Sequence, residues 1–206
     1  MPLVADVHHQ GSAIAIEAAH YADKIRINPG LLVYSKAQLD YSPSDIEREQ
    51  EAIAGALKPI IAACIDRGIP MRIGVNHGSL SPRLMYMYGD TPEGMVQSAM
   101  EYLQLSQDLG FTDLIVSMKA SRVNVMLAAN RLMAKTMADA GMNYPMHLGV
   151  TEAGQGDYAR TKSAIGIGSL LADGIGDTIR VSLTEDPVKE VTACNDILQA
   201  VGLRKT

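Results

Sequence analysis

The sequence has little of several features that would place a protein in a class at once. No apolar run in its 206 residues approaches the roughly 20 residues that a membrane helix needs. The N-terminus lacks the basic start and the long apolar region of a signal peptide. The net charge of −5 leaves no overall positive field to attract nucleic acid or an anionic membrane. Any binding site for an anion must therefore be local.

Cysteines and nucleotide-binding glycine motifs are scarce as well. The two cysteines, Cys64 and Cys194, lie far apart in segments that are predicted to be helical. We expect them to be reduced, which favours a reducing compartment such as the cytoplasm. Two isolated cysteines do not by themselves build a zinc or iron–sulfur site. No Gly-x-Gly-x-x-Gly follows a strand, so a nicotinamide cofactor is not expected.

What the sequence does contain is a regular alternation of short β-branched runs and longer helical patterns. The composition, 47% hydrophobic and 20% charged, is ordinary for one globular domain. Pro92 and Pro187 stand where helices begin, and Gly68, Gly110 and Gly174 where they end. This alternation predicts an α/β fold with a parallel sheet covered by helices. Strands are expected at 3–7, 24–28, 71–76, 113–119, 146–151 and 177–182, and helices at 12–22, 44–67, 92–109, 122–140, 158–172 and 187–201.

The strand ends favour a barrel over an open, doubly wound sheet. An open sheet gathers ligand groups at one switch point, whereas a barrel draws them from nearly every strand end. Here every predicted strand ends in polar residues, so we predict a parallel TIM-type (β/α) barrel. Only six βα units are found where a closed barrel needs eight. Either the sheet stays open or the chain is an excised portion of a longer protein, and we favour the second.

Three of the predicted strands present an arginine that is followed along the strand by a small polar or amide side chain. Guanidinium groups match phosphate oxygens in paired hydrogen bonds, and amides and hydroxyls complete such a site. The alternative for any one arginine is a structural ion pair with Asp6 or Glu152. The arginines and their companions are Arg26 with Asn28, Arg72 with Asn76, and Arg180 with Ser182.

Two further strand ends carry groups that can take part in chemistry. Lys119 is either a phosphate counter-charge, which we favour, or a Schiff-base nucleophile. Glu152, directly after Thr151, is the best placed general acid or base, and its alternative is an ion pair with Arg180 or Arg72. The chain then leads into Thr161-Lys-Ser, expected at a helix start that would favour phosphate.

Histidines offer a weaker possibility. Asp6, His8 and His147 could be imagined as metal ligands, but their spacing fits no specific motif. Histidines that only make structural hydrogen bonds are commoner. We therefore predict no metal site in this chain.

Seven segments form a familiar series when they are read in order along the chain. They are Leu3-Val-Ala-Asp-Val-His8, Arg26-Ile-Asn-Pro-Gly30, Arg72-Ile-Gly-Val-Asn-His-Gly-Ser79, Ser117-Met-Lys-Ala-Ser121, His147-Leu-Gly-Val-Thr-Glu-Ala-Gly154, Lys162-Ser-Ala-Ile-Gly166 and Gly176-Asp-Thr-Ile-Arg-Val-Ser-Leu-Thr184. Together they closely resemble the barrel domain of the 4-hydroxy-3-methylbut-2-enyl diphosphate synthase (GcpE/IspG) family, and the resemblance covers almost the whole chain. Asn76-His-Gly-Ser-Leu80 and Met142-Asn-Tyr-Pro-Met-His-Leu148 are most similar to its cyanobacterial and plastid branch.

The resemblance implies a reaction: the reductive ring opening and dehydration of 2-C-methyl-D-erythritol 2,4-cyclodiphosphate, in the non-mevalonate (MEP) pathway of isoprenoid biosynthesis. It implies that Glu152 and Thr151 lie near the reacting carbons, with Glu152 a candidate proton donor, and that Asp6 and His8 line the mouth of the site. The residues implied to hold phosphate oxygens are Arg26, Asn28, Arg72, Asn76, Lys119, Arg180 and Ser182.

The same resemblance places a 4Fe–4S cluster on a separate C-terminal domain, with ferredoxin or flavodoxin as electron donor, a homodimer as the complete protein, and the plastid stroma as the compartment in a photosynthetic eukaryote. We expect residues 1–206 to be a partial substrate-binding barrel, equivalent to strands 3–8. The cluster domain is expected to be absent, and the chain alone to be inactive. The alternatives are a stand-alone aldolase that uses Lys119 and a non-catalytic anion-binding module.

Overall fold

The computed structural model describes residues 1–8, 11–33 and 35–204. The chain forms two compact units, Met1–Val116 and Ser117–Thr206. The described ranges contain no helix that is long and apolar enough to cross a membrane. The predicted alternation of strands and helices is confirmed in both units.

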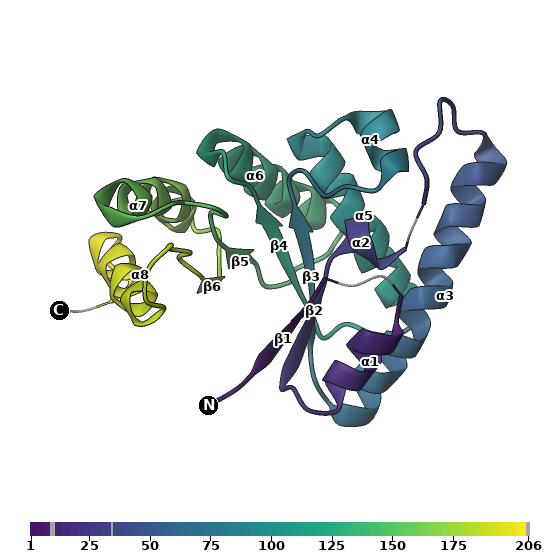
Figure 1. Ribbon diagram of the computed structural model, residues 1–206, viewed down its shortest axis with the longest axis horizontal. Helices are drawn as coiled ribbons and strands as arrows, with labels where there is room; N and C mark the ends of the chain where they lie inside the picture. The colour runs from purple at the N-terminus through teal and green to yellow at the C-terminus, as the bar shows by residue number, and fades with distance from the viewer. Residues whose placement is uncertain (9–10, 34, 205–206) are drawn as a thin grey trace. The chain divides into compact units, whose positions relative to one another are not determined.

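The first unit is built on parallel strands whose order in the sheet is β1-β2-β3-β4. Successive strands lie side by side, as they do in (β/α) barrels. In Figure 1, α1 packs between the strands and α3, while α5 lies against β3. The elements are β1 (Val4–Val7), α1 (Ala13–Ala19), β2 (Lys24–Ile27), α2 (Pro29–Leu32), α3 (Pro43–Arg67), β3 (Met71–Asn76), α4 (Pro82–Tyr88), α5 (Pro92–Asp108) and β4 (Leu114–Lys119), which continues into the second unit.

Local sequence explains how the long helices of this unit begin and end. Ser42 caps α3 by accepting a hydrogen bond from the amide of Asp45, whose carboxylate accepts in return from the amide of Ser42. Gly68 ends the same helix with φ of 62°, a conformation that glycine adopts without strain. Thr91, ahead of Pro92, caps α5 by accepting a hydrogen bond from the amide of Gly94. These signals explain why the boundaries of α3 and α5 lie within a residue of those expected.

The second unit packs three helices around short strands. In Figure 1, α7 lies beside α8, and α6 contacts α7. Strand β5 pairs in parallel with β6, and a single bridge joins Ala120 to Val150. Leu148, Val150, Ile167 and Val181 are buried in the core of this unit. Its elements after β4 are α6 (Val123–Asp139), β5 (His147–Leu148), α7 (Gly156–Ala172), β6 (Thr178–Ile179) and α8 (Val188–Ala200).

Three expectations about the second unit were wrong in detail. The strands expected at 146–151 and 177–182 shrink to β5 and β6, of two residues each. The segment Thr161-Lys-Ser is not at a helix start, because α7 already begins at Gly156. The amide of Gly156 donates a hydrogen bond to Glu185 Oε1.

Two short helices, α2 and α4, were not expected. Each begins with proline at its first position and has a capping side chain in front of it, Asn28 for α2 and Ser81 for α4. The signal was present, but four and seven residues are too few to show a helical period.

Candidate functional site

The strand register of the first unit brings three predicted site residues side by side. Asp6 on β1 pairs with Arg26 on β2, and Arg26 pairs with Arg72 on β3. Residues in register on neighbouring strands point to the same face of a sheet. Two guanidinium groups and one carboxylate therefore share one face of the sheet. On β3, Arg72 lies near the amino end of the strand, whereas Asn76 is its last residue.

Arg26 is the most constrained of the three, with only 4% of its surface exposed. Its NH1 donates to Asp6 Oδ1 at 2.7 Å and contacts the ring of His8, and its NH2 donates to the carbonyl oxygen of Gly74 at 2.8 Å. Its Nε is buried without a hydrogen-bond partner among the described residues. A Cβ at Gly74 would lie 2.1 Å from that Nε, so only glycine lets the guanidinium lie flat against β3.

Asp6 is held ionised by this arrangement. Burial raises the pKa of its carboxyl. The charges of Arg26, His8 and Arg72, together with the hydrogen bond from Arg26, lower the pKa by more than burial raises it, so the pKa lies below its ordinary value. The structural ion pair that we gave as the alternative for a strand-end arginine is thus present for Arg26. It coexists with the neighbouring Arg72 on the same face of the sheet.

The two predicted site asparagines of the first unit differ in their hydrogen bonds: Asn28 has structural partners, and the side-chain oxygen of Asn76 has none among the described residues. Asn28 is buried, caps α2 by accepting from the amide of Gly30, and donates to Ser79 Oγ at 3.2 Å. Asn76 instead has a buried Oδ1 with no hydrogen-bond partner among the described residues. Because the oxygen and nitrogen of an amide are assigned by their partners, Asn76 can offer a bound group either an acceptor or a donor.

The second unit brings Lys119 close to the strand that precedes Thr151. A Cβ at Gly149 would lie 3.1 Å from Lys119 Cε and 3.0 Å from the carbonyl oxygen of Arg180. The lysine side chain therefore runs over the bare backbone of Gly149. The end of β4 is itself fixed, because Asn130 Nδ2 donates to the carbonyl oxygen of Met118 at 2.9 Å.

Glu152 is exposed and has an unusual backbone. Its φ is 52°, and it is the only described residue other than glycine with positive φ. The ion pair between Glu152 and Arg180 that we gave as an alternative is not formed, because the carboxylate partner of Arg180 is Glu190, at 3.7 Å. Ser182 is partly buried two residues after Arg180.

The imagined metal site is not supported. Asp6 and His8 both contact Arg26, whose positive charge opposes a bound cation. His147 lies in the second unit, where its Nδ1 shares a 2.8 Å hydrogen bond with Thr178 Oγ1. No group of three or more His, Cys, Asp or Glu that could hold a metal occurs in the part of the chain that the structure describes.

The residues of this chain also do not fit an iron–sulfur cluster. Cys64 on α3 and Cys194 on α8 are separate free thiols. Burial raises the pKa of the Cys64 thiol to about 11, whereas cluster ligands are thiolates. These two thiols therefore do not form the ligand set of a cluster.

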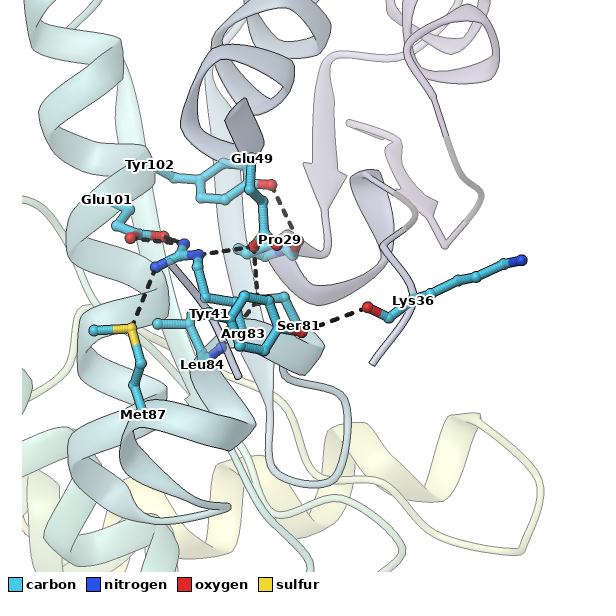
Figure 2. Close-up of polar contacts among 10 residues, drawn as sticks. All are labelled: Pro29, Lys36, Tyr41, Glu49, Ser81, Arg83, Leu84, Met87, Glu101 and Tyr102. Atoms are coloured by element: carbon cyan, nitrogen blue, oxygen red, sulfur yellow. Dashed lines mark hydrogen bonds and ion pairs between the residues drawn. The ribbon is translucent and has the colours of Figure 1, made fainter. Parts of the chain in front are cut away.

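Two polar clusters escaped the sequence interpretation. The first surrounds Arg83, which is almost fully buried, donates to Glu49 at 3.0 Å and forms a fork with Glu101 at 2.7 and 2.8 Å (Figure 2). Burial lowers the pKa of Arg83, but the two glutamates raise this pKa by more than burial lowers it. The arginine therefore stays charged. Ser81, the cap of α4, donates to the same Glu49. This cluster joins α3, α4 and α5 and is structural.

The second cluster lies at the start of α7, four residues after Glu152. Arg160 on α7 forms a fork with Glu185 at 2.8 and 2.9 Å, and Glu185 also accepts from the amide of Gly156. Nothing in the local sequence marks Arg160 and Glu185 as partners, because 25 residues separate them. Only the packing of α7 beside the segment before α8 brings them together.

Parallel strands with arginine, lysine and amide groups near their carboxyl ends define a class: (β/α) domains that bind a phosphorylated ligand at that end of the sheet. Residues 1–195 match the GcpE family, described as the GcpE TIM-barrel domain. The chain belongs to this family, and both the predicted family and the predicted TIM-type fold are confirmed.

Curated relatives agree with this assignment. The chain is 59% identical to a protein of Gloeobacter violaceus over 207 residues, which are 100% of the chain and 52% of the relative. It is 61% identical to one of Synechocystis over 209 residues, and these make up 52% of that relative. Both are named 4-hydroxy-3-methylbut-2-en-1-yl diphosphate synthase (ferredoxin), and both organisms are cyanobacteria, as expected. The chain spans about half the length of the curated relatives that it matches.

Proposed function

We propose that this chain is the substrate-binding barrel portion of a 4-hydroxy-3-methylbut-2-en-1-yl diphosphate synthase. The substrate would be 2-C-methyl-D-erythritol 2,4-cyclodiphosphate, whose ring is opened in a two-electron reduction with loss of water. The observation that carries the proposal is the register of Arg26 beside Arg72. Two adjacent guanidinium groups on one sheet face repel each other unless an anion or a carboxylate lies between them.

The donor inventory of Arg26 favours a shared role with Arg72. A guanidinium has five N–H groups, and Arg26 directs three of them to Asp6, His8 and Gly74. Of the other two, the Nε–H is buried without a partner among the described residues, and the second NH2 hydrogen and the charge are left for a phosphate. Arg72, which is only partly buried, is the more accessible donor. We assign the phosphate oxygens to both arginines and to Asn76, with Asn28 acting through the helix α2 that it caps.

In the second unit, Lys119, Arg180 and Ser182 supply the same chemistry. Lys119 contributes a counter-charge over Gly149, and the exposed Arg180 and partly buried Ser182 offer further donors. Glu152 would donate the proton that leaves with the hydroxyl as water, because an exposed carboxylic acid can exchange its proton with solvent between turnovers. Thr151, next to it, would orient the carbon skeleton.

The electrons would come from a 4Fe–4S cluster of the complete protein, reduced by ferredoxin, the donor that the relatives' names give, or by flavodoxin. We further propose a homodimer as the complete protein, a partial-barrel domain over residues 1–206, and a location in the cytoplasm or in the plastid stroma of a photosynthetic eukaryote.

A chimera tests the proposal. The 206 residues replace the matching stretch of the Gloeobacter violaceus protein, to which they are 59% identical. The chimera, loaded with its cluster, is assayed for conversion of the cyclic diphosphate with reduced ferredoxin, beside the unaltered relative as control. Turnover of the cyclic diphosphate supports the proposed function. A folded, cluster-loaded chimera that neither binds nor converts the substrate contradicts it.

A further inference from the structure

The loop from β5 to α7 holds Glu152 in a conformation that its own sequence disfavours. The φ of 52° at Glu152 is left-handed, and a side chain with a Cβ is strained there. Such a residue keeps its conformation only where the surrounding structure enforces it. The contacts of residues 151–156 show where that enforcement comes from.

The first half of the loop is fixed by the core of the second unit. The amide of Thr151 donates to the carbonyl oxygen of Ala120 at 3.2 Å. Ala153 is 2% exposed and belongs to the hydrophobic core. Lys162 Nζ donates to the carbonyl oxygen of Glu152 at 3.4 Å.

The second half of the loop has no side chain that enters the core, because it consists of Gly154, Gln155 and Gly156, and both glycines have positive φ. Its anchors come from the segment that precedes α8. The amide of Thr184 donates to the carbonyl oxygen of Gly154 at 2.8 Å, and Glu185 Oε1 accepts from the amide of Gly156 at 2.8 Å.

Glu185 is in turn held by Arg160, which binds both oxygens of its carboxylate. Arg160 NH1 and NH2 donate to its two oxygens at 2.8 and 2.9 Å, and Lys189 approaches at 3.5 Å. The hydrogen bonds from Arg160 and from Gly156 lower the pKa of Glu185 to about 2. The carboxylate therefore stays ionised, and the contact persists, over the working pH range of any enzyme near neutrality.

We propose that Glu185 and Arg160 are positioning residues that fix the 151–156 loop and so keep the Glu152 carboxylate in one orientation toward the substrate. The inference rests on the proposed function, because it takes Glu152 as the proton donor. Neither residue touches the reacting atoms. The alternative is an ordinary surface ion pair, which would contribute little to stability and nothing to the rate.

The chimera described above tests this inference with two substitutions. Glu185→Gln keeps an acceptor for the amide of Gly156 but loses the charge, and Arg160→Met keeps the aliphatic stem but loses the fork. Both are expected to lower kcat about 10- to 100-fold, the effect of a small misplacement of a catalytic group. KM for the cyclic diphosphate should stay within about twofold, because the phosphate-binding groups are untouched.

Asp173→Asn is the matched control. It breaks another arginine–carboxylate pair of the second unit, in which Arg131 Nε donates to Asp173 Oδ2 at 2.8 Å and Arg131 NH2 lies 2.7 Å from the same oxygen. Asp173 caps the opposite end of α7 and does not touch the loop, so kcat should be unchanged. Amide hydrogen exchange at residues 154–156 should accelerate in the two test variants and not in this control.

The outcomes separate the two proposals. If the unsubstituted chimera is active and both test variants keep its kcat, the positioning role is wrong and the proposed function stands. A fall in kcat that only follows a lower Tm, and that Asp173→Asn shares, also overturns it. If Glu185→Gln does not fold, Arg160→Lys, which keeps the charge but not the fork, replaces it. An unsubstituted chimera without activity overturns the proposed function, and this inference with it.

Discussion

Asp6 and Arg26 lie opposite each other on β1 and β2, and Asp6 Oδ1 accepts a 2.7 Å hydrogen bond from Arg26 NH1. The arginine side chain is 5% exposed and the carboxylate 42%. The pair is thus asymmetric: the cation depends on the fold for its partners, while the anion remains in contact with water. This asymmetry decides what happens when either partner is changed.

We expect Asp6→Asn to lower the free energy of unfolding of the chain by about 1 kcal/mol, because it leaves a buried guanidinium with a weaker acceptor, while the exposure of Asp6 limits the loss. Urea unfolding of the chain measures the change. The control is Arg48→Gln, which removes the exposed Arg48–Asp45 pair and should have almost no effect. Equal changes in the two variants would contradict the buried role of Arg26.

The acid dependence of stability should carry the signature of Glu185. Its pKa falls from 4.5 to about 2 on folding, so its contribution is fully present above the unfolded pKa and is lost as the pH falls through the folded one. The difference in unfolding free energy between the wild type and Glu185→Gln should therefore shrink between about pH 5 and pH 2. Urea unfolding over this range tests it. A difference that does not change with pH would show that the carboxylate is not held in its ionised form.

Gly74→Ala should be destabilising by about 1–3 kcal/mol, because its Cβ would lie 2.1 Å from the buried Arg26 Nε. The side chain that must move belongs to the proposed phosphate site, so the affinity for the cyclic diphosphate should fall as well. Gly55→Ala is the matched control: it lies within α3, where an added Cβ meets nothing within 4 Å, and should stabilise by about 0.5–1 kcal/mol. Thermal unfolding and calorimetry measure both effects, and equal stabilities of the two variants would contradict the prediction.

Arg72→Gln should weaken binding of the cyclic diphosphate to the chimera about 10- to 100-fold, the loss expected for one charge-assisted contact. Isothermal titration calorimetry gives the Kd directly. Arg131→Gln, which alters an arginine paired with Asp173, should leave the Kd unchanged. An unaltered Kd in Arg72→Gln would remove Arg72 from the site.

Lys119 should behave as a counter-charge and not as a nucleophile. Borohydride treatment of the chain with phosphorylated aldehydes or ketones should add no mass at Lys119, because no Schiff base forms there. Lys119→Met should weaken binding of the cyclic diphosphate to the chimera. Trapping of a carbonyl compound on Lys119 would instead support the aldolase interpretation, with mass spectrometry locating the adduct.

Much of the fold could be predicted because its signals are local. Ser42, Thr91 and Gly68 fix helix ends through contacts within a few residues, and these boundaries were predicted to within a residue. The strands at 71–76 and 113–119 also agree with β3 and β4 to within a residue, because both faces of these strands are largely buried and their sequence is correspondingly apolar. The strands of the second unit were overestimated because an apolar run does not reveal whether a neighbouring strand pairs along its full length.

By itself the sequence determined the alternation of strands and helices, the polar strand ends and, through ordered motifs, the family. Only the tertiary structure decided how the predicted groups are used. Arg26 donates hydrogen bonds to Asp6, 20 residues away in the sequence, and to Gly74, 48 residues away. Asn28 is a helix cap. Glu185, paired with Arg160, accepts from the amide of Gly156, four residues after the left-handed Glu152. These contacts depend on strand register and helix packing, which join segments far apart in the chain, and no local propensity encodes them.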